Sequence, residues 1–219
     1  ALGENLEDYA KTFKSESGKY VELMNGLGFC MLIKKSLIEE IGVFDEIYGM
    51  GNFEDTDFSM RAKRKRYLCV RALGTYVYHQ ENTSFNVFRR YHYEFEKNKK
   101  FFESRWGKQK RILFIIGKDI LEESHKQKIS KELDQNNWVY LTGKSNLKFS
   151  KDHPGFNTYH FGNMFNVKIL LKILFKKKKF DEIYCDSLRF LRFLRLLQPI
   201  HKAALLTLKN NQKNIASVL

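Results

Sequence analysis

The stretch RILFII at residues 111–116 restricts the fold of this chain more than any other feature. A short, continuous apolar run of this kind is typical of a strand that is buried on both faces of its sheet. A strand in that position needs a layer of helices above and below it. We therefore expect an α/β arrangement in this part of the chain.

The residues after this run alternate between patterns typical of helices and of strands. Helices are predicted at 122–133, 167–177 and 188–197, and strands at 138–142, 157–161, 182–185 and 203–208. Strands that alternate with crossover helices form parallel sheets. The sequence therefore predicts a Rossmann-like domain.

The first part of the chain has a different pattern. We expect a short strand at 31–33, a helix at 35–41, a helix at 57–65, strands at 67–70 and 75–78, and an amphipathic helix at 86–105. That last pattern stops at Trp106-Gly107-Lys108. We therefore predict two domains, residues 1–107 and 108–219.

The charge is distributed unevenly over the 219 residues, whose net charge is +14. Residues 1–107 hold 17 Lys and Arg against 16 Asp and Glu, whereas residues 108–219 hold 22 against 9. A net charge of +13 in the second part predicts an anionic partner for it.

Composition also narrows the setting. No stretch approaches the roughly 18 apolar residues that a membrane-spanning helix needs, and the first residues do not have the pattern of a secretory signal. Cys30, Cys69 and Cys185 are odd in number and far apart, which argues against a disulfide framework or a zinc site. We expect a reducing, cytoplasmic environment. The initial Ala is typical of a fragment.

The most unusual polar feature is the segment GMGNFEDTDFSMRAKRKRY at residues 49–67, which places Glu54, Asp55 and Asp57 within four positions. Acidic residues in the first turn of a helix stabilise it, and Asp57 suits that role or the role of a cap. A second interpretation is a general base at the edge of a cleft. A third is a D-x-D metal site, but here the acids lead into a helix, where adjacent Asp side chains diverge.

The context of these acids favours the base. Upstream lies NGLGFCMLIKKSLIEEIGVFDEIYG, downstream YVYHQENTSF, and a helix that is rich in aromatic and basic residues then ends with FFESRWG. In this order and spacing, residues 21–107 resemble the C-terminal half of a family 2 glycosyltransferase with the GT-A fold. The overall prediction is a partial GT-A domain followed by a basic Rossmann-like domain.

The resemblance implies a role for each acid. Asp55 would be the general base that takes the proton of the acceptor hydroxyl, and the sugar would be transferred with inversion. Glu54 would bind acceptor hydroxyls or raise the proton affinity of Asp55 by like-charge repulsion. Asp57 would keep a structural place at the start of the helix.

The resemblance also implies binding residues. Asn25, Gly26 and Gly28 would line the donor-sugar pocket, although a simple turn before a strand explains them almost as well. The acceptor loop would consist of Met50, Gly51 and Asn52.

His79 would ligate a divalent metal, Mn²⁺ or Mg²⁺, in the complete enzyme, or touch the leaving diphosphate. A surface or core histidine is the alternative reading of this position. An imidazole ligand suits Mn²⁺ better than Mg²⁺.

The implied partners are a sugar-nucleotide donor and a glycan or lipid-linked acceptor, as in bacterial polysaccharide biosynthesis. The family's first half, with its donor-binding strands, has no counterpart in these residues, so we expect the isolated chain to be inactive. The alternative function is a non-catalytic interaction module that docks through its basic domain.

Two stretches of the basic domain stand out, KILLKILFKKKKF and LRFLRFLRLL. One interpretation is helices packed on a sheet with a solvated basic rim. The other is attraction to an acidic membrane surface, which would place the protein at the inner face of the membrane. No motif indicates specific binding of nucleic acid.

Overall fold

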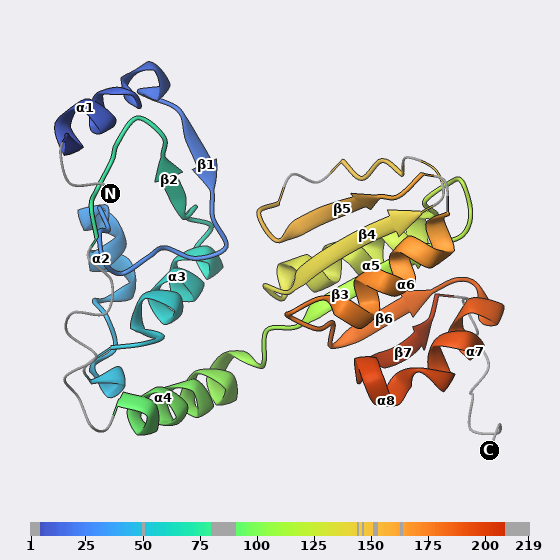
Figure 1. Ribbon diagram of the computed structural model, residues 1–219. Helices are drawn as coiled ribbons and strands as arrows, with labels where there is room; N and C mark the ends of the chain where they lie inside the picture. The colour runs from blue at the N-terminus through green and yellow to red at the C-terminus, as the bar shows by residue number, and fades with distance from the viewer. Residues whose placement is uncertain are drawn as a thin grey trace. The chain divides into compact units, whose positions relative to one another are not determined.

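The computed structural model describes residues 5–49, 51–79, 91–143, 145, 147–150, 153–162 and 164–208. The chain divides into two compact units, Ala1–Lys108 and Gln109–Leu219 (Figure 1). The division falls one residue from the expected boundary. Each unit has its own sheet and its own core.

The second unit is built on a five-stranded parallel sheet with the order β5-β4-β3-β6-β7. Its strands are β3 (Arg111–Ile116), β4 (Trp138–Gly143), β5 (Phe156–His160), β6 (Glu182–Cys185) and β7 (Ala204–Thr207). The predicted α/β class and parallel sheet are confirmed. The strand order, with β3 at the centre and crossovers to both sides, is compatible with a Rossmann-like domain.

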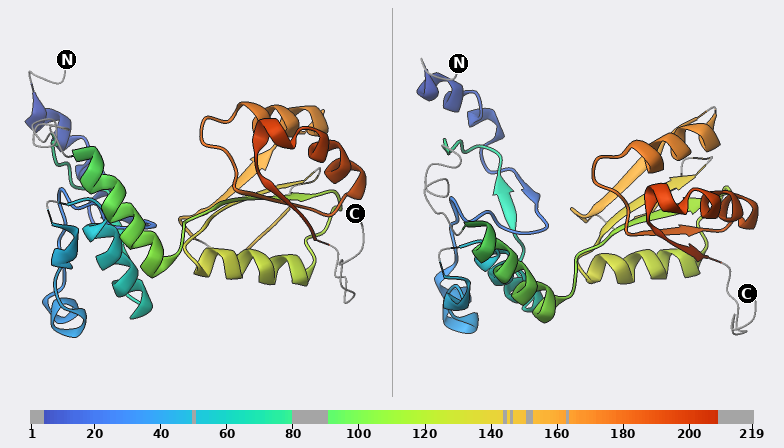
Figure 2. Two further views of the ribbon diagram at one scale, coloured as in Figure 1. Left: turned by 90° about the horizontal axis from the view of Figure 1, so that it is seen from below. Right: turned by 60° about the horizontal axis from the view of Figure 1, so that its bottom comes forward.

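Helices cover both faces of this sheet (Figure 2), as the continuous apolar sequence of β3 requires. One face holds Ile112, Phe114 and Ile116 and packs against α5 (Glu123–Asp134). The other face holds Leu113 and Ile115 and packs against α6 (Phe165–Phe175) and α7 (Leu188–Leu196). A short helix, α8 (Gln198–His201), follows α7. Successive side chains of β3 therefore enter two different cores.

The first unit has a smaller sheet, in which β1 (Tyr20–Glu22) pairs antiparallel with β2 (Val70–Ala72). Its helices are α1 (Leu6–Lys11), α2 (Lys35–Ile41), α3 (Glu54–Arg64) and α4 (Tyr91–Trp106), with short 3₁₀ helices at Lys14–Glu16 and Glu46–Tyr48. Helices α2 and α3 meet at a small core of Leu37, Phe58 and Ala62.

Several expectations for this unit were wrong in detail. Residues 31–33 and 75–78 are not strands, and the strand expected at 67–70 lies at Val70–Ala72. Met31 and Ile33 are apolar because they pack against the core of α2 and α3, and not because they join a sheet. Helix α3 begins at Glu54, three residues before its expected start. The GT-A assignment stays a prediction.

Within the described part of the chain, no helix is both long enough and apolar enough to span a membrane.

Candidate active site at the start of helix α3

The loop before the acid cluster has an unusual backbone. Gly49, Gly51, Asn52 and Phe53 all have positive φ angles, of 57°, 112°, 72° and 77°. For residues other than glycine this region of backbone space is unfavourable by roughly 1–3 kcal/mol each. Asn52 and Phe53 therefore need support from elsewhere in the fold. Met50, expected in the acceptor loop, lies outside the described residues.

Part of that support comes from Asn98 of α4. Its side-chain amide donates hydrogen bonds to the carbonyls of Tyr48, at 2.7 Å, and of Gly51, at 2.8 Å. Asn98 is only 1% exposed. The first carbonyl directly precedes the loop and the second lies within it, so one buried side chain holds the first half of the loop.

Aromatic contacts with α4 hold the rest of the loop. The ring of Phe53 lies 5.4 Å from the rings of both Phe95 and Phe102. The hydroxyl of Tyr91 donates to Oδ1 of Asn52 at 3.2 Å. The apolar face expected for this helix therefore packs against the residues that lead into the acid cluster.

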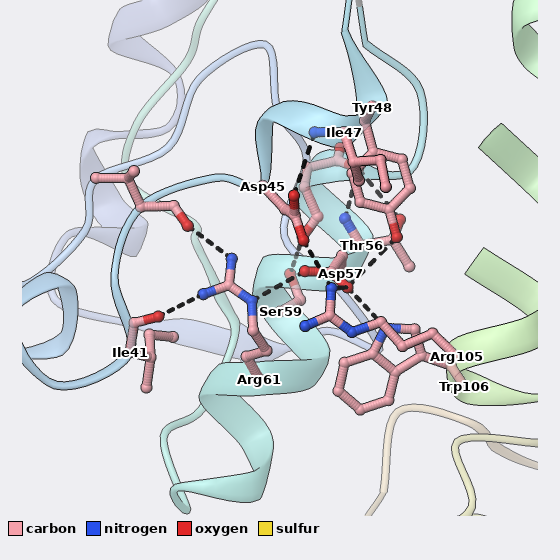
Figure 3. A network of polar contacts seen from close by, with 12 residues as sticks. Ile41, Asp45, Ile47, Tyr48, Thr56, Asp57, Ser59, Arg61, Arg105 and Trp106 are labelled. Atoms are coloured by element: carbon pink, nitrogen blue, oxygen red, sulfur yellow. Dashed lines mark hydrogen bonds and ion pairs between the residues drawn. The ribbon is translucent and has the colours of Figure 1, made fainter. Parts of the chain in front are cut away.

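Asp57 is the centre of a buried polar network (Figure 3). Its side chain is completely buried and accepts hydrogen bonds from Trp106 Nε1 at 2.8 Å and Arg61 Nε at 2.9 Å. Arg105 Nη1 forms an ion pair with it at 3.1 Å, and the Tyr48 hydroxyl lies 3.4 Å away. Asp57 lies in the first turn of α3, as expected, but it does not cap the helix. Its structural role is instead to accept hydrogen bonds and charge from side chains of α3 and α4.

The two arginines extend this network to the turn after α2. Arg61 also donates to the carbonyls of Ile41 and Val43, both at 2.7 Å. Arg105 donates to Asp45 at 2.8 Å, and the other oxygen of Asp45 accepts from the backbone N–H of Ile47. That backbone bond, together with the charge of Arg105, lowers the pKa of Asp45 below its ordinary value although partial burial opposes the shift.

Burial in the same network raises the pKa of Tyr48 well above its ordinary value, and the charge of Asp57 adds to the shift. Tyr48 is therefore neutral at physiological pH and can donate a proton to the hydrogen bond with Asp57.

Asp55 lies outside this network and contacts a different segment. Its Oδ2 accepts from the backbone N–H of Gly28 at 2.8 Å, and its Oδ1 accepts from the N–H and hydroxyl of Thr56 at 2.6 and 3.1 Å. A carboxylate has about four lone-pair positions, so Asp55 can accept a further hydrogen bond. The side chain is partly exposed.

Glu54 has an oxygen whose hydrogen-bonding capacity is unused. Three buried side-chain polar atoms in the described part of the chain lack a hydrogen-bond partner: Glu54 Oε2, Asn25 Oδ1 and His125 Nδ1. Burial raises the pKa of Glu54, and the neighbouring charge of Asp55 adds to the rise.

Two of the expected donor-pocket glycines lie against α3. The N–H of Gly26 donates to the hydroxyl of Ser59 at 2.9 Å. A Cβ atom on Gly28 would lie 3.2 Å from Oδ2 of Asp55, and one on Gly26 would lie 2.7 Å from the Cε atom of Met31. At Gly28 a side chain would therefore crowd the carboxylate of Asp55 on α3, whereas at Gly26 the nearest atom is the end of the flexible Met31 side chain, which can move aside.

His79 lies near the same segment. Its imidazole packs on the ring of Phe29 with 4.6 Å between centroids, and Phe29 directly follows Gly28. Over the residues that the structure describes, no group of three or more His, Cys, Asp and Glu side chains is arranged to hold a metal. The metal role of His79 stays a prediction.

The structure thus joins Gly28 to Asp55 by a direct hydrogen bond and joins Gly26 to α3 through Ser59. Glu54 directly precedes Asp55, and its side chain lies beside Gly51. Sequence reasoning missed the supporting residues Asn98, Arg105 and Trp106. The spacing of Asp57 and Arg61, one helical turn apart, was a visible signal. Asn98 and Trp106 lie more than forty positions from their partners, and no local pattern indicates those contacts.

No family model matches the chain, and comparison with curated proteins and with solved structures finds no significant similarity.

Proposed function

We propose that the chain is part of an inverting glycosyltransferase that transfers a sugar from a sugar nucleotide to a hydroxyl group of a glycan or lipid-linked acceptor. Asp55 takes the proton of the acceptor hydroxyl as its oxygen forms a bond to the anomeric carbon. The bond from that carbon to the diphosphate oxygen breaks, and the nucleoside diphosphate leaves with the electron pair. The first unit would then be the acceptor side of a GT-A domain.

The observation that carries this proposal is the unused hydrogen-bonding capacity of Glu54 and Asn25. Buried polar atoms in folded proteins almost always have partners, yet Glu54 Oε2 and Asn25 Oδ1 have none in the described structure. Both belong to residues that were expected to bind the sugars. Hydroxyl groups of a substrate are suitable donors for both oxygens.

The division of labour among the acids also supports the proposal. Asp57 is fully committed to the buried network, so the fold does not need Asp55 for that purpose. Asp55 is held by the N–H of Gly28 and retains room for one more donor. A base positioned within hydrogen-bond reach typically contributes 10²–10⁴-fold to the rate.

A second candidate function is a non-catalytic interaction module. It is favoured by the three protein donors that already occupy the carboxylate of Asp55. In that case Asp55 would only tie the start of α3 to the segment of Gly28. This function predicts no chemistry with any sugar nucleotide.

The test is a sugar-nucleotide panel with the full-length protein, with Mn²⁺ or Mg²⁺ present and release of the nucleoside diphosphate as readout. We expect turnover with at least one donor, and Asp55→Asn to lower it about a hundredfold or more with little change in donor binding. For the 219-residue chain alone we expect none.

Glu7→Gln, on the exposed helix α1, is the matched control and should leave turnover unchanged. An absence of turnover with every donor would favour the interaction module. Normal turnover in Asp55→Asn would remove Asp55 as the base while leaving the transferase function intact.

A further inference from the structure

Helix α6 carries two apolar stripes. Phe165, Ile169 and Ile173 face the sheet and are buried in its core. Val167 and Leu171 are about half exposed and Phe175 is 77% exposed. The last three recur every four residues, so they form a second stripe that points away from the sheet. The core of the unit needs only the first stripe.

Helices α7 and α8 add to this outer surface. They lie on the same side of the sheet as α6 (Figure 2). Leu191 and Leu194 of α7 point inward, whereas Leu196 is 79% exposed and directly follows the exposed Arg195. We define the outer face as the exposed apolar and basic residues of α6, the lysine run after it, α7 and α8: Val167, Lys168, Leu171, Phe175, Lys177, Lys178, Lys179, Leu188, Arg189, Arg192, Phe193, Arg195, Leu196 and Ile200.

The charge of the outer face has one sign. Neither α6 nor α7 contains Asp or Glu, and the run Lys176–Lys179 between them contains none either. Lys176 turns inward against the rings of Tyr140 and Phe180, at 4.3 and 5.1 Å from their centroids. Lys177 and Lys178 are exposed. Among the described ion pairs, none involves a basic residue of α6 or α7.

We propose that the outer face docks on the surface of a bilayer that contains anionic phospholipids. Exposed aliphatic and aromatic side chains flanked by Lys and Arg are the combination that binds the headgroup region, where apolar burial and lipid charge act together. Protein interfaces are depleted in Lys, and interfaces with nucleic acid are more polar than this face. The eleven residues of α6 are too few to span a bilayer, so the helix lies on the surface.

The experiment is a flotation assay of the full chain with vesicles of phosphatidylcholine alone and with about 30% phosphatidylglycerol. We expect anionic vesicles to bind about tenfold or more tightly than neutral vesicles, and the difference to shrink as salt is raised. Leu171→Gln/Phe175→Gln tests the apolar part of the face, and Lys177→Glu/Lys178→Glu tests its charge. Each should lower binding about tenfold or more.

Matched controls change the same chemistry elsewhere. Leu32→Gln/Ile120→Gln alters two exposed apolar residues that do not belong to the outer face, and Lys126→Glu/Lys131→Glu alters two charges on α5, across the sheet. Both should bind anionic vesicles like the wild type. If Leu171→Gln/Phe175→Gln does not fold, the single change Leu196→Gln on α7 replaces it and should weaken binding by a smaller factor.

Three outcomes would overturn the proposal. One is that no vesicle floats the protein. Another is that the controls lose as much binding as the variants of the outer face. The third is that heparin or RNA binds as tightly as anionic vesicles and Leu171→Gln/Phe175→Gln has no effect, which would define a site for soluble polyanions.

Discussion

The two units of this chain are stabilised in different ways. Of the described residues, the second unit buries twenty hydrophobic side chains and the first unit six. The first unit instead buries the carboxylate of Asp57 beside its small apolar core, where two arginines and a tryptophan contact it from the surface. An apolar core tolerates changes that keep its volume, whereas a buried charge depends on every partner.

This difference concerns function as well as stability. In the first unit, the acid that holds the fold together is two positions from the acid proposed to react. In the second unit, the core is separate from the surface proposed to bind lipid. We therefore expect substitutions in the first unit to couple stability and activity more often.

The largest expected effect is that of Asp57→Ala. It leaves Arg61 and Arg105 without their buried partner and should lower the free energy of unfolding of the first unit by about 3–5 kcal/mol. Hydrogen exchange followed by mass spectrometry would localise the loss. The control, Asp8→Ala, removes an exposed ion pair and should change stability by less than about 0.5 kcal/mol. Equal effects of the two substitutions would refute the structural role of Asp57.

Asn98→Ala should have the next largest effect. It removes the donor for the carbonyls of Tyr48 and Gly51, and a buried group left unpaired destabilises by about 1–3 kcal/mol. We expect faster hydrogen exchange in the loop before α3 and lower affinity for the acceptor. His92→Ala changes an exposed position of the same helix and should leave exchange in the loop as it is. If hydrogen exchange in the loop is unchanged in Asn98→Ala, the aromatic contacts with α4 are enough to hold the loop.

A smaller effect is expected in the second unit. Ile183→Val removes one methylene group from a fully buried side chain of strand β6 and should destabilise this unit by about 0.5–1.5 kcal/mol. Ile120→Val makes the same chemical change at an exposed residue and should be silent in a thermal melt. If Ile183→Val speeds exchange in the first unit too, the two units do not unfold independently.

The smallest effect concerns pH. Because burial raises the pKa of Glu54 in the folded protein, the folded state holds its proton to a higher pH than the unfolded state does. Stability should therefore fall as pH rises from the ordinary pKa, 4.5, through the raised pKa. Glu54→Gln should flatten that part of the pH–stability curve. Glu7→Gln should leave the curve unchanged. If stability falls with pH as steeply in Glu54→Gln as in the wild type, Glu54 is not the source of the pH dependence.

The second unit could be predicted from the sequence much better than the first. Strands β3 and β6 both lie at the predicted residues. The position of β3 is visible in the sequence because a strand buried on both faces forms a continuous apolar run. In the first unit the apolar residues Met31 and Ile33 suggested a strand, but they pack on helices. Local pattern cannot separate these two uses of an apolar run.

The candidate site shows the same limit. The acid cluster and the glycine segment were identified from motif spacing, and Gly28 and Asp55 do form a hydrogen bond. The hydrogen bonds from the buried Asn98 side chain to the loop and the position of Trp106 beside Asp57 both depend on the packing of α4. Contacts between positions so far apart in sequence follow from the tertiary fold and leave no periodic trace.

The most direct test of this account compares Asp55→Asn with Asp57→Asn in the full-length protein, with turnover and thermal stability measured on the same preparations. We predict that Asp55→Asn abolishes nearly all turnover and melts close to the wild type, whereas Asp57→Asn loses the folded first unit. Normal turnover in Asp55→Asn would contradict the division of roles between the two acids. Wild-type stability in Asp57→Asn would contradict it equally.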